Sequence, residues 1–473
     1  MKKYILMIAL LPALSMVGKV RLPALLSDNA VLQQQSDVKL WGESSNGKEV
    51  KITPSWSNQT VTAKVAKDGS WNATVHTPEG GFTPYEITFD DGEKTTIGNI
   101  LLGEVWLASG QSNMEQTLYG YEQCPVVNAA EEIVNASRET GIRMFNVERI
   151  RKDEPQEWGG GSWMLPNVDT APVFSAASWF FAKSLTRSLN VPVGMVTAAA
   201  GGSMIESWMS KEIVENYPDI PTDKEGIEKM HSWLRPLGLY NAMFHPIRRF
   251  TFKGILWYQG CSNVGKHETY AQRMADMVEL WRKDLGQGDI PFYYVELAPF
   301  AHFDRPDGIE AALLREAQYK AQEMIPNSAM IPTNDLVEPH EVYNVHPRGK
   351  EKVGQRLCYA ALKHTYGKDR IHYSGPKYKD LSITGNEATV SFSNIPMGLC
   401  RTEGIVGFEI AGADKVFHPA EVVKVDKRGG KVTLRNSDVP EPVAVRYCFR
   451  NFQLGNLTGA YELPAVPFRT DNW

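Results

Sequence analysis

The chain has 473 residues, of which 42% are hydrophobic and 22% are charged, and its formal net charge is −5. This composition, with 39 glycines and 28 prolines, is typical of a loop-rich folded protein, and the length predicts about two or three domains. The negative charge and the lack of a long basic run argue against binding of nucleic acid, which depends on clustered lysine and arginine.

The N-terminus predicts export. A Met-Lys-Lys start precedes an apolar stretch over residues 4–17, and Ala13 and Ser15 form a small-residue site suited to signal peptidase. We therefore expect residues 1–18 to be a signal peptide, the protein to be secreted or periplasmic, and no membrane span to remain after processing. A buried N-terminal strand or a retained anchor is the alternative interpretation.

Two β-rich regions flank a region in which strands and helices alternate. Short alternating segments between turn residues predict an N-terminal β domain over 19–97, and the pattern returns in a β-rich segment over 369–473. Over 98–368 the pattern predicts an α/β domain, a parallel sheet with helices on both faces. The predicted strands are 105–108, 193–197, 255–258, 292–296 and 329–333, and the predicted helices are 176–189, 269–285, 310–324 and 350–364.

A serine follows the first predicted strand, in the sequence Gly-Gln-Ser-Asn-Met over 110–114. Ligand sites of such sheets lie beyond the carboxyl ends of the strands. On this strand-to-helix loop the hydroxyl of Ser112 can project into a cleft, which suits a nucleophile. A serine beside a glycine is also common in ordinary loops, so this motif alone does not decide the function.

Candidate oxyanion donors follow the second and third strands. Gly201 and Gly202 let backbone N–H groups approach a developing oxyanion closely, and Asn263, in the segment Trp-Tyr-Gln-Gly-Cys-Ser-Asn, offers a side-chain amide. A tight turn explains the glycines, and turn formation explains the asparagine, equally simply.

A histidine follows the last predicted strand and precedes a helix. His346 is placed to take the proton of a serine and return it to a leaving group. The order of these features, serine, glycine, asparagine and histidine after successive strands, resembles the four sequence blocks of the SGNH hydrolases. The segments at 31–33, 238–243, 314–318 and 467–471 further resemble the sialate O-acetylesterase family, and the resemblance extends over 26–473.

The resemblance implies an SGNH, flavodoxin-like three-layer core over 98–368 and a serine esterase that removes acetyl groups from carbohydrate, first of all from O-acetylated sialic acid. It requires no metal or organic cofactor. The residues it assigns are Ser112 and His346 for catalysis, Gly201, Gly202 and Asn263 with the backbone N–H of Ser112 for the oxyanion hole, and Gln111, Gln259 and Arg315 for the sugar or its carboxylate.

The group that orients His346 is not fixed by the sequence. The family tends to carry an acid two residues before this histidine and the wider group carries one three before, where this chain has Asn344 and Tyr343. Asp335, at the end of the last strand, is the first candidate for this role. Glu341 and a backbone carbonyl are the alternatives, because the orienting group need only fix the tautomer and the alignment of the imidazole.

Other functions stay open at this point. The substrate can equally be acetylated xylan or another glycan. Cys261, which stands where the family usually has glutamate, and Asn344 also permit a non-catalytic carbohydrate-binding protein on the same fold. The chain has no GxSxG or HExxH motif, which argues against an α/β-hydrolase or a zinc protease. Its five cysteines are odd in number and lack a CxxC pair, so neither a disulfide framework nor a zinc site is predicted.

Overall fold

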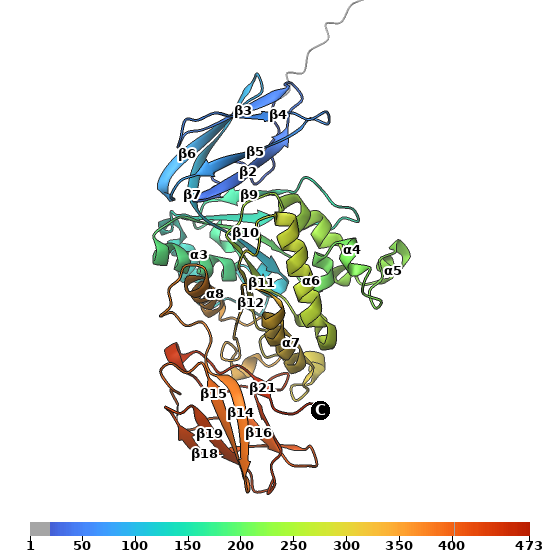
Figure 1. Cartoon of the computed structure of the whole chain (residues 1–473), viewed down its shortest axis with the longest axis vertical. Coiled ribbons are helices and arrows are strands. Elements are labelled where there is room, and N and C mark those ends of the chain that lie inside the picture. Colours follow the sequence, from blue (N-terminus) through green and yellow to red (C-terminus); the bar gives the residue numbers. More distant parts are fainter. Residues whose placement is uncertain (1–18, 402) are drawn as a thin grey trace, which may run out of the picture.

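The computed structural model describes residues 19–401 and 403–473, so the predicted signal peptide at 1–18 lies outside the described residues. Three regions follow one another along the long axis of the molecule (Figure 1). They are a β-rich N-terminal region, a central α/β region and a β-rich C-terminal region. The predicted α/β class with flanking β-rich segments is confirmed.

The N-terminal region is built from short strands in which buried and exposed side chains alternate. In β3, for example, Val50 and Ile52 are fully buried whereas Glu49 and Lys51 are exposed. β2 pairs with β5, and β3 pairs with β4 and β6, all antiparallel. The strands are β1 (Val31–Gln33), β2 (Ser36–Glu43), β3 (Glu49–Pro54), β4 (Val61–Lys64), β5 (Ser70–Thr77) and β6 (Gly81–Asp90).

One long strand, β7 (Lys94–Gly110), connects the N-terminal region to the central region. Its first part pairs with β6 and β1, and its second part pairs in parallel with β10 and β11. The strand continues without interruption across the domain boundary predicted at residue 97. The two regions therefore share a strand, and its carboxyl end at Gly110 delivers the chain directly to Ser112.

The central region contains a sheet in the order β13-β12-β11-β7-β10-β8-β9, parallel except for β9 at its edge. All five predicted strands are present in it. β8 and β9 were not predicted from the sequence. Beyond β7 the strands are β8 (Ile142–Val147), β9 (Gly161–Met164), β10 (Val193–Ala199), β11 (Gly254–Tyr258), β12 (Phe292–Val295) and β13 (Ser328–Ile331).

The strand order places a crevice at the end of β7. Numbered along the chain, the five predicted strands lie in the order 2-1-3-4-5, so successive connections run in opposite directions on the two sides of β7. In open parallel sheets the ligand binds where this direction reverses, outside the carboxyl ends of the strands. Ser112 begins the short helix α1 (Ser112–Glu115) at this position.

Helices cover both faces of the sheet (Figure 1). Successive side chains of a strand point to opposite faces, so each strand can pack against helices on both sides. In β7, Trp106 and Ala108 pack in the cluster that includes α3 and α8, whereas Val105 and Leu107 pack in the cluster that includes α6 and α7. The covering helices are α3 (Ala176–Leu189), α6 (His267–Leu285), α7 (Glu310–Met324) and α8 (Lys350–His364). None of the described helices is both long and apolar enough to cross a membrane.

Shorter helices lie in the loops of the central region. They are α2 (Ala129–Asn135), α4 (Lys211–Val214) and α5 (Lys224–Lys229).

The C-terminal region consists of two four-stranded sheets, ordered β14-β15-β19-β18 and β17-β16-β20-β21, around an apolar core of their own. It is fixed to the central region through polar contacts. Asn451 accepts a hydrogen bond from the backbone of Ala311 at 2.7 Å, and Arg469 pairs with Glu316 of α7 at 2.9 Å. The strands are β14 (Lys377–Thr384), β15 (Glu387–Ser393), β16 (Phe408–Ala411), β17 (Phe417–Pro419), β18 (Glu421–Asp426), β19 (Lys431–Arg435), β20 (Ala444–Tyr447) and β21 (Phe468–Arg469).

Candidate active site

Ser112 is positioned by a tight passage between β7 and β11. Gly110 has a φ of +139°, and a Cβ at this residue would lie 2.2 Å from the carbonyl oxygen of Tyr258. Only glycine fits this close approach and this backbone conformation. The next residue, Gln111, donates its backbone N–H to the same carbonyl at 3.0 Å and accepts from the backbone of Gly260 at 2.8 Å. These contacts fix the backbone on which Ser112 stands.

The loop after β10 carries both predicted glycines and places Gly201 next to this serine. A Cβ at Gly201 would lie 3.5 Å from the Cβ of Ser112. The backbone N–H of Gly201 donates to a carboxylate oxygen of Glu115 at 2.7 Å, so this donor is occupied within the protein. Gly202 has a φ of +73° and lies against Trp233, 3.1 Å from where its Cβ would stand.

His346 lies on the loop between β13 and α8, close to the serine segment. The ring of Tyr121 packs edge-to-face on the imidazole, with 4.8 Å between centroids, and its hydroxyl donates to the carbonyl oxygen of Ser112 at 3.1 Å. Burial, and next the positive charge of Lys350, lower the pKa of His346 to about 4. The imidazole is therefore neutral at neutral pH, which is the form a general base requires.

A second connection between the two segments runs through Asn113. This side chain is 2% exposed and donates to the carbonyl oxygen of Val345 at 3.0 Å. Its own oxygen accepts from the Nζ of Lys350 at 2.7 Å, and that Nζ also donates to the carbonyl oxygen of Pro347 at 2.7 Å. Backbone on both sides of His346 is thus tied to the residue that follows Ser112.

In the described part of the chain no hydrogen bond joins the hydroxyl of Ser112 to His346. Catalytic hydrogen bonds without a bound substrate are often long or poorly aligned and form only in the complex. The Nε2 atom of His346 is buried without a hydrogen-bond partner in this structure. Ser112 and His346 are both half-buried, and Tyr121 and Asn113 connect their segments.

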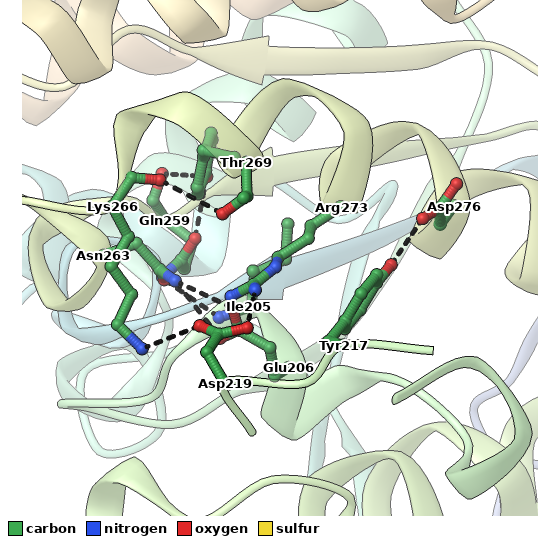
Figure 2. A network of polar contacts seen from close by, with 11 residues as sticks. Ile205, Glu206, Tyr217, Asp219, Gln259, Asn263, Lys266, Thr269, Arg273 and Asp276 are labelled. Carbon is green, nitrogen blue, oxygen red and sulfur yellow. Dashed lines mark hydrogen bonds and ion pairs between the residues drawn. The ribbon is translucent and has the colours of Figure 1, made fainter. Parts of the chain in front are cut away.

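Asn263 lies in a network of polar contacts with Gln259, Glu206 and Arg273 (Figure 2). Its oxygen accepts from Gln259 at 2.7 Å and from the backbone of Ile205 at 3.0 Å, and its nitrogen donates to the carboxylate of Glu206 at 3.1 Å. Glu206 is in turn paired with the buried Arg273 at 2.5 Å. The network fixes the loop after β11 to the segment that follows β10, which carries the glycines.

A cleft of about 630 Å³ opens beside the serine. Its lining residues are Arg149, Ile150, Arg151, Ala200, Gly201, Gly202, Ser232 and Trp233. A cavity of about 670 Å³ lies elsewhere, against α6 and residues 324–326, and none of the predicted site residues lines it. Gly201 lines the first cleft and also lies next to Ser112, so this cleft is the one adjacent to the predicted nucleophile.

A model of the family described as carbohydrate esterase, sialic acid-specific acetylesterase matches residues 102–363. The chain belongs to this family of esterases. Sialate O-acetylesterases of Homo sapiens and Mus musculus are 26% and 25% identical to it, over 79% of this chain and over 76% and 78% of those proteins. A solved structure of a novel carbohydrate acetylesterase from Xanthomonas citri is 34% identical, covers 96% of this chain and 100% of that one, and has a TM-score of 0.84.

These matches confirm the family resemblance and show that the chain is a carboxylic ester hydrolase, for which the family implies an acetylated carbohydrate substrate. The residue assignments rest on the sequence motifs and on the geometry described above. Of the nine residues assigned from the sequence, the structure gathers Ser112, His346, Gly201 and Gly202 into one cluster at the carboxyl ends of the strands.

None of the three residues predicted to contact the sugar lines the cleft beside Gly201. Gln111 and Gln259 are buried, and Gln259 donates to the carbonyl oxygen of Ser203 at 3.1 Å and accepts from Tyr270 at 2.8 Å. Arg315 is 2% exposed and donates to a backbone carbonyl of the C-terminal region, that of Arg450, at 2.5 Å. In this structure all three bond to the protein itself.

Asp335 has a partner other than the predicted one. Both of its carboxylate oxygens accept from Arg356, at 2.7 and 2.6 Å. Glu341, the second candidate, accepts from the backbone of Glu338 at 2.7 Å. Across residues 19–401 and 403–473 no carboxylate hydrogen-bonds to His346. The side chain of Asn344 contacts the backbone of His346, not its imidazole: its oxygen accepts the backbone N–H at 2.9 Å.

Cys261, a partly buried residue after β11, lies near Lys350. Burial raises the pKa of the Cys261 thiol to about 12, so the thiol is neutral at neutral pH. Burial also lowers the pKa of Lys350 to about 7, although Cys261, Cys124 and Glu341 act in the opposite direction. A fully buried lysine side chain therefore lies near a neutral thiol.

Sequence reasoning missed Lys350 and the cleft residues Arg149, Arg151 and Trp233. The signal for Lys350 is its position four residues after His346, at the start of a predicted helix. The signal for the two arginines is the basic sequence Glu-Arg-Ile-Arg-Lys over 148–152, which follows the strand β8 that was not predicted.

Proposed function

We propose that the protein is a serine esterase with an SGNH-type core that hydrolyses O-acetyl esters on carbohydrate, with Ser112 as nucleophile and His346 as general base. The observation that carries this assignment is the pair of contacts that tie the two segments together. Asn113 bonds to Val345, and Tyr121 contacts both the serine backbone and the imidazole. The strand order and the position of Ser112 at the reversal point support the same fold and function.

In the proposed reaction the neutral imidazole of His346 takes the proton from the Ser112 hydroxyl as its oxygen attacks the acetyl carbonyl carbon. The imidazolium then gives this proton to the departing sugar oxygen, which leaves an acetyl ester on Ser112. Water, deprotonated by the same imidazole, attacks the acetyl-enzyme, and the imidazolium returns the proton to the Ser112 oxygen as acetate is released. We propose a Ser-His dyad without a carboxylate, because Asp335 is bound to Arg356.

The tetrahedral oxyanion needs donors at the positions where its charge develops. We assign this role to the backbone N–H groups of Ser112 and Gly202, since that of Gly201 is bound to Glu115. Asn263 remains the proposed third donor, because an amide nitrogen with two hydrogens can serve both Glu206 and the oxyanion.

The proposed leading substrate is O-acetylated sialic acid. This assignment is supported by the family description and by the curated relatives, which are sialate O-acetylesterases. Acetylated xylan is the alternative glycan substrate. We also propose that the protein is exported after removal of residues 1–18, a proposal that N-terminal sequencing of the protein from the producing cell tests directly.

The test is acetate release from O-acetylated sialic acid and from a small acetyl ester by the wild type, Ser112→Ala and His346→Ala. We expect kcat to fall by at least about a thousandfold in both variants, with circular dichroism and melting temperature unchanged. Ser382→Ala and His340→Ala, at exposed positions, are the matched controls. Full activity in folded Ser112→Ala would contradict the assignment.

A further inference from the structure

Two arginines that take no part in the proposed reaction line the cleft beside Ser112. Its eight lining residues include Arg149 and Arg151 and no acidic residue. Both arginines follow β8, whose carboxyl end lies at the same edge of the sheet as the end of β7. Gly201 separates the cleft from Ser112, so a ligand bound there is within reach of the nucleophile.

The arginines of this cleft are only partly neutralised. Arg149 pairs with Glu115 at 2.8 Å. Arg151 donates to the backbone carbonyl oxygens of Trp233 at 3.0 Å and of Arg235 at 3.3 Å, and it has no ion pair in the described structure. Burial, and then the charges of Arg149 and Arg235, lower the pKa of Arg151 to about 10, so its guanidinium is still charged at neutral pH.

An aromatic side chain, Trp233, lines the same cleft as the two arginines. Trp233 is 51% exposed and lines the cleft, and its ring stacks on His231 with 5.0 Å between centroids and 12° between planes. Gly202 approaches the Trp233 ring so closely that a Cβ would lie 3.1 Å from it. A half-exposed indole held in one orientation offers an apolar face to the C–H groups of a sugar ring, as aromatic side chains in binding sites do.

We propose that this cleft is the specificity site for a sugar carboxylate: Arg151 binds the carboxylate and Trp233 packs on the ring, with the acetyl group directed over Gly201 to Ser112. The substrate class is then an O-acetylated acidic sugar, a sialic acid or a uronic acid, and a neutral sugar such as xylose lacks the group that Arg151 recognises. This inference rests on the proposed esterase function and adds to it the residue that selects the substrate.

The backbone bonds of Arg151 give it a fixed orientation. Because two carbonyl oxygens hold part of the guanidinium, the side chain loses less freedom when it binds a ligand. Arg149 shares its charge with Glu115 and contributes to the field rather than to a direct contact. We therefore assign the larger part of the discrimination to Arg151.

The test compares kcat/KM for acetate release from O-acetylated N-acetylneuraminic acid and from the same compound with its carboxyl group masked as the methyl ester. A second pair, acetylated galacturonic acid and its methyl ester, distinguishes sialic from uronic acids, and acetylated xylose represents neutral sugars. In at least one pair we expect kcat/KM for the free acid to be about tenfold higher than kcat/KM for its methyl ester. The ratio of these two values should fall as the salt concentration rises.

The decisive variant is Arg151→Gln, which keeps a hydrogen-bond donor but removes the charge. In this variant we expect kcat/KM for the free acid to be about equal to kcat/KM for the methyl ester. The decrease in kcat/KM for the free acid should come from a higher KM, with kcat nearly unchanged. Arg435→Gln, an exposed position of β19, makes the same change in net charge and is expected to keep the wild-type ratio. Trp233→Ala is expected to raise KM for both forms of the sugar.

Equal kcat/KM for the free and masked acids in the wild type, or an unchanged ratio in Arg151→Gln, would overturn this assignment. Either outcome leaves the esterase proposal intact as long as acetate is released and Ser112→Ala abolishes that release. Failure of the proposed function itself appears differently, as an absence of acetate from every substrate. The two failures are therefore distinguishable in one set of measurements.

Discussion

The side chain of Asn113 donates a hydrogen bond to the carbonyl oxygen of Val345 at 3.0 Å, and so joins the residue after the serine to the residue before the histidine. The two are separated by 232 positions in the sequence. Lys350 completes the connection, since its ammonium group bonds both Asn113 and Pro347. These contacts, and not a direct bond between the catalytic side chains, hold the proposed dyad together in this structure.

The first prediction concerns this connection. Asn113→Asp keeps the oxygen that accepts from Lys350 but cannot donate to Val345, so the histidine loop loses its fixed distance from Ser112. We expect kcat to fall by about tenfold or more with KM nearly unchanged, because small misplacements of reacting groups are costly. The exposed Asn72→Asp on β5 is the control. A folded Asn113→Asp enzyme with wild-type kcat would show that the connection is not needed.

The second prediction concerns the acid limb of the rate profile. Burial and Lys350 lower the pKa of His346 to about 4, so the imidazole stays neutral and able to accept a proton down to about that pH. We expect kcat/KM to decline near pH 4 rather than near 6.5. Lys350→Met removes a positive charge that lowers the pKa of His346, so the decline in kcat/KM is expected at a higher pH in this variant. A limb near 6.5 in the wild type would contradict this environment for His346.

The third prediction links Lys350 to stability. Its pKa is lowered from 10.5 to about 7 in the folded protein, so between these values the unfolded chain binds a proton that the native state does not. The contribution of this group to the free energy of unfolding therefore rises with pH from about 7 to about 10.5 and is unfavourable below 7. Urea titrations at pH 6 and pH 9 measure it, and Lys350→Met is expected to remove the rise.

Cys261→Glu provides a sharper form of the same experiment. A carboxylate beside Lys350 favours the charged ammonium group and raises its pKa toward the ordinary value. We expect this variant to lose the increase in stability between pH 7 and 10.5, whereas the neutral Cys261→Gln should keep it. An identical pH profile in Cys261→Glu and the wild type would mean that the two side chains do not interact.

The fourth prediction concerns Asp335. Because Asp335 binds Arg356 with both oxygens, Asp335→Asn leaves the buried guanidinium without its counter-charge. We expect a loss of roughly 2 to 4 kcal/mol in the free energy of unfolding, measured with urea, and wild-type kcat for the enzyme that remains folded. A drop in kcat of a hundredfold or more without loss of stability would instead identify Asp335 as the orienting acid.

Much of the fold could be predicted from the periodicity of the sequence. The helices α3, α7 and α8 coincide with their predicted ranges because apolar residues recur at spacings of three and four. β8 was missed because Arg143 interrupts its apolar run. That side chain is 5% exposed, and one of its terminal nitrogens donates to the backbone carbonyl oxygens of Thr140 and Ile142.

Because β8 was not predicted, the cleft residues that follow it were not predicted either. Ser112 and His346 were found because each follows a predicted strand, but the loop with Arg149 and Arg151 follows β8 and was not searched. Gln259 and Asn263 were predicted to contact substrate or oxyanion from local motifs. In the structure they bond to each other and to Ser203, Ile205 and Glu206 of a distant segment, and no local pattern predicts that second set of contacts.

The most direct test of the central claim is labelling with a serine-reactive phosphonate, followed by mass spectrometry of the peptides. The account predicts a single adduct on Ser112 that forms rapidly in the wild type and much more slowly in His346→Ala, since the imidazole removes the proton of the hydroxyl. Labelling of another residue, or no labelling of a protein that releases acetate, would contradict Ser112 as the nucleophile of this esterase.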